Sequence, residues 1–146
     1  MEQREQQIWQ RVLGDQTCQQ ETDLKTLALN SVETVAQLRQ FLRSASPKER
    51  ELLKELVEEE QRNLACIKGL NYLQTGQQIR LLSFPPTEPA QKRQLVKRYH
   101  CARRAMAEYT ARSAESEWGC VFRDMAQRQE RQCALLAQLI GIVGKG

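Results

Sequence analysis

The sequence contains few of the residues that interrupt helices. Its 146 residues include 7 glycines and 4 prolines. A scarcity of both leaves few turns, which disfavours an all-β domain built from many short strands. The residue types that are frequent, Gln, Ala, Leu, Glu, Lys and Arg, include the strongest helix formers. The composition therefore predicts an all-α protein, and the length fits one domain over residues 1–146.

Long apolar runs are also missing. No stretch approaches the roughly 20 apolar residues that a membrane span requires. The apolar tail from Ala134 to Val143 is interrupted by Gln138 and Gly141, which favours a buried helix end. The first ten residues, MEQREQQIWQ, hold no apolar run, so we expect no signal peptide. We accordingly expect a cytoplasmic protein that does not bind membranes.

Histidine occurs once, as His100. It stands in a basic segment, Lys92 to Arg104, and the sequence suggests neither a nucleophile nor an orienting acid for it, so we expect it on the surface. The segment could bind a nucleic-acid backbone. The net charge is only +4, however, because acidic residues nearly balance the basic ones. We therefore interpret the segment as the solvated face of a helix and do not expect nucleic acid as a partner.

The cysteines do not form a disulfide or zinc pattern. There are five of them and no C-x-x-C pair. An odd number without an export signal indicates reduced thiols. Four of them, with Met106 and Met125, could bind a soft metal such as copper, although free cysteine is more commonly a small buried hydrophobe. The five are Cys18, Cys66, Cys101, Cys120 and Cys133.

Apolar residues recur at helical spacing in five segments. We predict a short helix over about 2–13 and four longer helices over about 22–44, 47–74, 90–114 and 119–140. Thr22 is the expected N-cap of the first long helix. Ser46, followed by a proline and by Glu49, predicts a capping box, and Gly76 predicts a left-handed C-cap. We expect the C-terminal glycines to fray the last helix.

The segment from Gln77 to Gln91 is the longest predicted connection. It contains the sequence FPPTEP, which cannot be helical. A link of this length allows the 47–74 and 90–114 helices to run parallel. We therefore predict a four-helix bundle, about residues 22–141, with one long crossover.

Polar residues interrupt the apolar stripes at the middle of two predicted helices. Glu60 and Asn63 do so in the 47–74 helix, and Gln129 and Gln132 in the 119–140 helix. A spacing of i, i+3 places both members of each pair on one helix face. Burying an unpaired amide costs roughly 1–3 kcal/mol, so these groups must be paired or used. We predict that Gln129 and Gln132 donate hydrogen bonds to a buried Glu60.

Ser31 and Ala102 stand at the same level of the two remaining helices. We favour a hydrogen-bonded polar layer that fixes the register of the helices. An altered metal site and a pocket for a small ligand remain open as alternatives.

With this pattern the chain resembles the ferritin-like superfamily, and rubrerythrin-type proteins in particular, over about Leu24 to Gly141. The segment LNYLQTG, residues 70–76, is similar to a helix end of some rubrerythrin-like chains. A family tyrosine often follows a single ligand glutamate by seven residues, and Tyr109 follows Ala102 at this distance. In the family, two Glu-x-x-His pairs and two single glutamates hold two metal ions. The resemblance implies six former ligand positions: Ser31, Glu60, Asn63, Ala102, Gln129 and Gln132.

Of these six positions, only Glu60 carries a carboxylate. Two divalent cations need several anionic ligands, and amides are poor neutral donors. We therefore expect no metal and no cofactor, with iron as the alternative.

These patterns together predict a ferritin-like bundle that has lost di-iron chemistry. We expect a binding or assembly protein of unknown partner, with no catalytic residues. The alternative is a rubrerythrin-type di-iron oxidoreductase or peroxidase with substituted ligands. The resemblance also implies a homo-oligomer, with a dimer favoured. We expect the short N-terminal helix to pack on the bundle or on a second subunit.

Overall fold

The structure, a computed structural model, describes the backbone of residues 16–80 and 91–145 and the side chains of residues 24–80 and 91–144. The described residues form four helices and no strand, which confirms the predicted all-α four-helix bundle. The short helix predicted for residues 2–13 lies outside the described residues. The four helices are α2 (Gln16–Arg43), α3 (Pro47–Thr75), α4 (Lys92–Glu115) and α5 (Gly119–Lys145).

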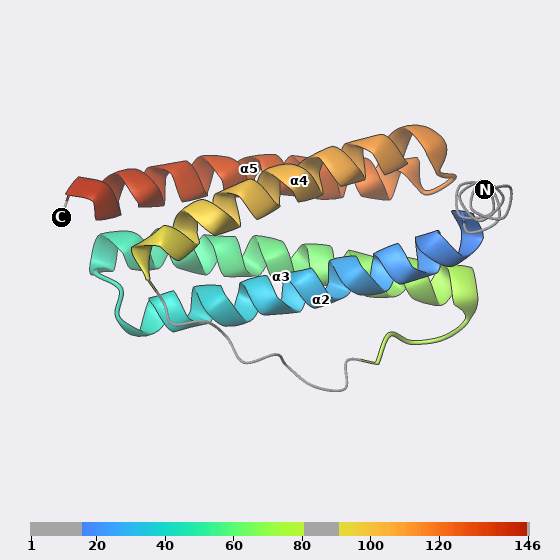
Figure 1. The fold of residues 1–146 in the computed structure, drawn as a ribbon, viewed down its shortest axis with the longest axis horizontal. Coiled ribbons are helices and arrows are strands. Elements are labelled where there is room, and N and C mark those ends of the chain that lie inside the picture. Colours follow the sequence, from blue (N-terminus) through green and yellow to red (C-terminus); the bar gives the residue numbers. More distant parts are fainter. Residues whose placement is uncertain (1–15, 81–90, 146) are drawn as a thin grey trace, which may run out of the picture.

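The helices form two antiparallel hairpins that lie against each other. α2 pairs with α3, α4 pairs with α5, and α3 also packs against α5 (Figure 1). α3 ends at the opposite end of the bundle from the point where α4 begins, so these two helices run in the same direction (Figure 1). This is the parallel order that the long connection predicted.

The ends of α3 have the capping residues that the sequence predicted. The Ser46 side chain accepts a hydrogen bond from the Glu49 N–H at 3.4 Å, and the Glu49 carboxylate accepts one from the Ser46 N–H at 3.4 Å. This reciprocal pair satisfies two N–H groups that the first turn of a helix leaves unpaired. At the other end, Gly76 has φ 71° and donates its N–H to the Tyr72 carbonyl at 2.7 Å.

Two predicted helix ends are wrong. α2 begins at Gln16, so Thr22 lies inside the helix and is not its N-cap. Residues 16–21 contain no glycine or proline, so nothing in this segment prevents the helix from beginning before Thr22. α5 continues through Gly141 and Gly144 to Lys145, where we expected fraying. The apolar side chains Ile140 and Val143 pack on the core there, which offsets the helix cost of glycine, about 1 kcal/mol per residue.

The core consists of two apolar clusters with the polar layer between them. Along α3, the apolar residues Leu56 and Ile67 belong to different clusters, and Glu60 and Asn63 stand between them. Along α5, Met125 and Leu136 flank the two glutamines in the same way. The first cluster, the Tyr109 cluster, comprises Leu24, Ala28, Ile67, Leu70, Ile79, Tyr109, Phe122, Met125 and Ala126. The second, the Leu56 cluster, comprises Val35, Leu38, Leu53, Leu56, Val57, Leu95, Ala102, Leu136 and Leu139.

None of the described helices combines the length with the apolar character that crossing a membrane requires.

Candidate functional site

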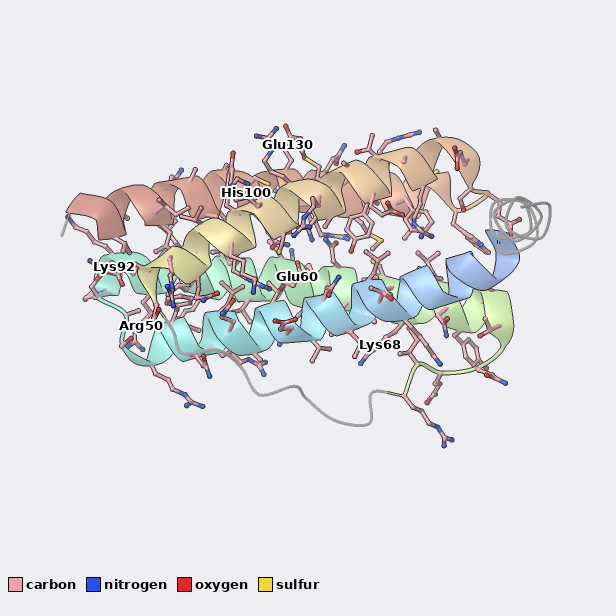
Figure 2. All side chains as sticks on the ribbon, in the orientation of Figure 1. Arg50, Glu60, Lys68, Lys92, His100 and Glu130 are labelled. Carbon is pink, nitrogen blue, oxygen red and sulfur yellow. The ribbon has the colours of Figure 1, made fainter. Side chains whose placement is uncertain are left out.

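The structure buries the six residues that the sequence placed in the polar layer and also Tyr109, which was expected nearby. Each of the seven side chains is less than a tenth exposed, so all of them face the interior of the bundle. Figure 2 labels Glu60 near the middle of α3. The seven are Ser31, Glu60, Asn63, Ala102, Tyr109, Gln129 and Gln132.

Glu60 is held by the two glutamines of α5, as the sequence predicted. Gln129 Nε2 donates to Glu60 Oε2 at 2.9 Å, and Gln132 Nε2 donates to the same oxygen at 2.8 Å. Both amides reach one oxygen because residues three apart project from the same face of a helix. Ser31 of α2 adds a long hydrogen bond, 3.5 Å, from its hydroxyl to the backbone carbonyl of Glu60.

Asn63 makes a separate contact between α3 and α5. Its Nδ2 donates to the Met125 carbonyl at 3.2 Å, and its Oδ1 accepts from Arg128 at 3.2 Å. Asn63 is the second member of the predicted pair with Glu60, but its side chain bonds to the backbone of Met125 and the side chain of Arg128 and does not join the carboxylate. Its role is therefore to fix how α3 and α5 pack.

An open groove of about 580 Å³ runs between α2 and α4 and reaches down to the polar layer. α2 and α4 contact each other less than the other neighbouring helices do. Small side chains face the space from both helices, among them Ser31 on α2 and Cys101, Ala102 and Ala105 on α4. Six of the seven predicted residues, all except Asn63, line this single groove: Ser31, Glu60, Ala102, Tyr109, Gln129 and Gln132.

Glu60 presents one carboxylate oxygen to the groove. Its Oε2 accepts both amides, whereas Oε1 accepts no hydrogen bond from the described residues. Oε1 is also not enclosed by protein atoms, so it borders the open space. A carboxylate that is 5% exposed and half-paired is an acceptor for a group that enters from the groove.

Tyr109 supplies a hydroxyl on the same groove. Burial raises the pKa of Tyr109, and the nearby negative charge of Glu60 raises it further. The phenol is therefore protonated at neutral pH. Its hydroxyl makes no hydrogen bond within the described part of the chain, and it can act as a donor to a bound molecule.

Arg98 is the residue of the groove that the sequence analysis missed. We expected the Lys92 to Arg104 segment to be a solvated face, but the Arg98 side chain is only 5% exposed. It reaches from α4 to α2, where NH1 donates to Thr34 Oγ1 at 2.9 Å. The sequence could have indicated its burial, because Leu95, Arg98 and Ala102 are spaced by three and four residues and so share the buried face of α4. His100, in contrast, is exposed, as expected (Figure 2).

The donor set of the polar layer does not fit a pair of irons. Glu60 is the one carboxylate of the polar layer, and the two glutamines direct N–H groups, which cannot bind a cation, at that carboxylate. Within residues 24–80 and 91–144, no three His, Cys, Asp or Glu side chains gather as metal ligands would. Cys66, Cys101 and Cys133 are partly buried free thiols and Cys120 is an exposed one. The side chain of Cys18 lies outside the described residues.

Comparison with known proteins gave no relative. No protein-family model matches the chain, and no curated protein or solved structure matches it significantly.

Proposed function

We propose that this chain is a ferritin-like, rubrerythrin-related bundle that has lost di-iron chemistry and works as a binding protein, taking a small molecule into the groove between α2 and α4. The order of the helices supports the relationship, because two hairpins joined by one long crossover are the arrangement of ferritin-like folds (Figure 1). The polar layer supports it as well, since it lies at mid-bundle, where such folds hold their metals.

One observation supports the binding function most strongly. A groove of about 580 Å³ ends on a buried carboxylate whose Oε1 atom has no partner among the described residues. Ligand sites commonly have about 300–1,000 Å³ of volume, apolar walls and a few convergent polar groups. Here Leu27, Leu38 and Leu136 supply apolar wall, and Glu60 and Tyr109 supply polar groups.

The alternative of a di-iron oxidoreductase or peroxidase has no observation in its favour. Its chemistry needs a set of anionic ligands, and the polar layer offers Glu60 and two amides that already bind it. The groove also lacks a histidine, since the single histidine of the chain is exposed on α4. A cytoplasmic location and a homodimer remain predictions, and sedimentation of the purified protein checks the dimer.

A thermal-shift screen of the full chain tests the binding function. The probes are small amines, carboxylic acids, zwitterions and neutral amides, and the variant is Ala102→Leu, which fills the groove next to the polar layer. A probe at 100 times its Kd stabilises the folded chain by about 2.7 kcal/mol. For a chain of this size we expect a rise of roughly 5–10 °C in Tm, and we expect Ala102→Leu to abolish it.

Ala107→Leu is the matched control, because Ala107 is on the same helix but exposed and outside the groove. It should keep the shift of the unchanged chain. The proposal is wrong if no probe raises Tm, or if Ala102→Leu responds to every probe as the unchanged chain does.

A further inference from the structure

Two buried side chains of opposite charge line the groove, and neither has all the partners that its hydrogen-bonding groups require. Glu60 on α3 has an Oε1 atom that accepts no hydrogen bond from residues 24–80 or 91–144 and lies on the side of the groove. Arg98 on α4 is the cation, and its side chain is as buried as that of Glu60. An incompletely paired charge is costly in a core, so two such groups on one groove call for an explanation.

The guanidinium of Arg98 has more donors than the structure uses. One N–H, on NH1, donates to Thr34 Oγ1 at 2.9 Å. Arg98 forms a long ion pair with Glu33, whose Oε1 lies 4.0 Å from NH2, beyond hydrogen-bond distance. Nε has no partner within the described residues but is enclosed by protein atoms, so the donors left for a ligand are those of the terminal nitrogens NH1 and NH2. A planar guanidinium with free donors is the group that proteins use to bind a carboxylate or phosphate through two parallel hydrogen bonds.

The two charges lie at neighbouring levels of the groove. Ala102 belongs to the layer of Glu60, and Arg98 precedes it by four residues on the same helix. Four residues correspond to about 6 Å along a helix axis. The other charged side chains of the groove lie nearer its rim and are more exposed than these two: Glu33, Lys97, Arg104 and Glu108.

On the basis of the proposed binding function, we propose that the ligand is a small zwitterion, with an anionic group on the Arg98 guanidinium and a protonated amine on Glu60 Oε1. Such a molecule pairs both buried charges at once. A ligand with one charge leaves the opposite protein charge without a close partner of its own, and this difference gives the groove its selectivity. The protonated Tyr109 hydroxyl can donate a further hydrogen bond to the ligand.

Isothermal titration of the full chain with linear ω-amino acids, from glycine to 6-aminohexanoate, tests the assignment. Butyrate and butylamine are the single-charge controls. We expect at least one ω-amino acid to bind tenfold or more tightly than either control, with an optimum of chain length. If no ω-amino acid of the series binds more tightly than butyrate and butylamine, the assignment is wrong, and this result needs no variant protein.

Charge-removing variants then assign each end of the ligand. Glu60→Gln should weaken the best ω-amino acid at least tenfold and leave butyrate unchanged. Arg98→Gln should weaken it by a similar factor and leave butylamine unchanged. Arg103→Gln, an exposed arginine of the same helix outside the groove, should bind as the unchanged chain does.

These outcomes distinguish the zwitterion assignment from the binding function on which it rests. If Arg98→Gln folds and binds every compound normally, Arg98 only joins α4 to α2 through Thr34, and the assignment is wrong. If single-charge or neutral probes bind as tightly as zwitterions and Ala102→Leu abolishes their binding, the assignment is wrong but the binding function is supported. If no probe binds at all, both fail.

Discussion

The chemistry of the polar layer depends on a single carboxylate, Glu60, which lies among amide side chains. Glu60 is almost fully buried, and its two closest partners are the neutral amides of Gln129 and Gln132. Neutral donors stabilise a buried charge less than a cation would. The site therefore keeps a group that it has not fully compensated, as expected of a position that pairs with a ligand.

Substitution of Glu60 separates a hydrogen-bonded layer from a working metal site. Glu60→Gln keeps an oxygen that accepts both amides and removes the buried charge, so we expect the free energy of unfolding to change by less than about 1 kcal/mol or to increase. Glu60→Leu leaves the amides of Gln129 and Gln132 without an acceptor and should cost about 1–3 kcal/mol more. Urea denaturation of both variants measures the difference. A loss of several kcal/mol in Glu60→Gln, together with release of a bound ion, would indicate a metal site.

Tyr109 should make the bundle sensitive to alkaline pH. Burial and the charge of Glu60 raise its pKa, with smaller contributions from Cys66 and Glu108, whereas Arg112 lowers it. The unfolded chain releases the phenolic proton near the ordinary value of 10.0, while the folded chain retains it. Above that pH the unfolded state binds fewer protons, so stability is full below pH 10 and falls as the pH rises.

Urea unfolding at about pH 8 and about pH 11 measures this effect. Tyr109→Phe should lose less stability than the unchanged chain over this interval, because it has no phenol to ionise. Tyr72→Phe is the control, because Tyr72 is exposed, and it should behave as the unchanged chain does. Equal losses in all three proteins would show that Tyr109 does not titrate as described.

The spacing of polar residues along the helices was enough to predict the polar layer, but it did not predict Arg98 or the direction of the Asn63 side chain. Glu60, Gln129 and Gln132 could be predicted because polar pairs three apart interrupted otherwise apolar stripes. Arg98 could not, because its neighbours in the basic segment suggested solvent and its length lets it reach Thr34 on another helix. Asn63 was placed in the layer correctly, but its direction toward the Met125 backbone depends on how α3 and α5 pack.

Among the helices, local residues determine the ends of α3 and packing determines the ends of α2 and α5. The capping box at Ser46 and the left-handed Gly76 are local motifs, and both were predicted. The continuation of α5 through Gly141 and Gly144 was not, because it depends on apolar contacts of its last turns with the rest of the bundle.

Two glycines of α5 should respond oppositely to alanine. Gly141→Ala adds a methyl group with no atom within 4 Å and removes a flexible residue from a helix interior, so we expect a gain of about 0.5–1 kcal/mol. At Gly119 a Cβ would meet the Ser113 carbonyl oxygen at 2.5 Å, across the tight link from α4. We expect Gly119→Ala to destabilise the chain by about 1–3 kcal/mol, since backbone must move to admit it. Thermal melts compare the two, and stabilisation by Gly119→Ala would contradict the close approach.

For the whole molecule, the arrangement of the helices creates the groove that the residues alone could not show. Residues 77–91 predicted the crossover by their length and their prolines, and hence the parallel order of α3 and α4. The separation of α2 from α4 could not be predicted, because it depends on how four helices share one core. The small side chains at Ser31 and Ala102 then leave open space beside the polar layer.

Metal content is the most direct test of the account that this bundle binds without di-iron chemistry. The full chain is purified without chelator, supplied with iron and manganese during expression, and examined by elemental analysis, with Tm measured before and after dialysis against EDTA. We predict neither metal near a stoichiometric amount and no change in Tm, because Glu60 is the one carboxylate of the polar layer and it is bound by two amides. Two iron or manganese ions per chain, with a fall in Tm after EDTA, would contradict the account.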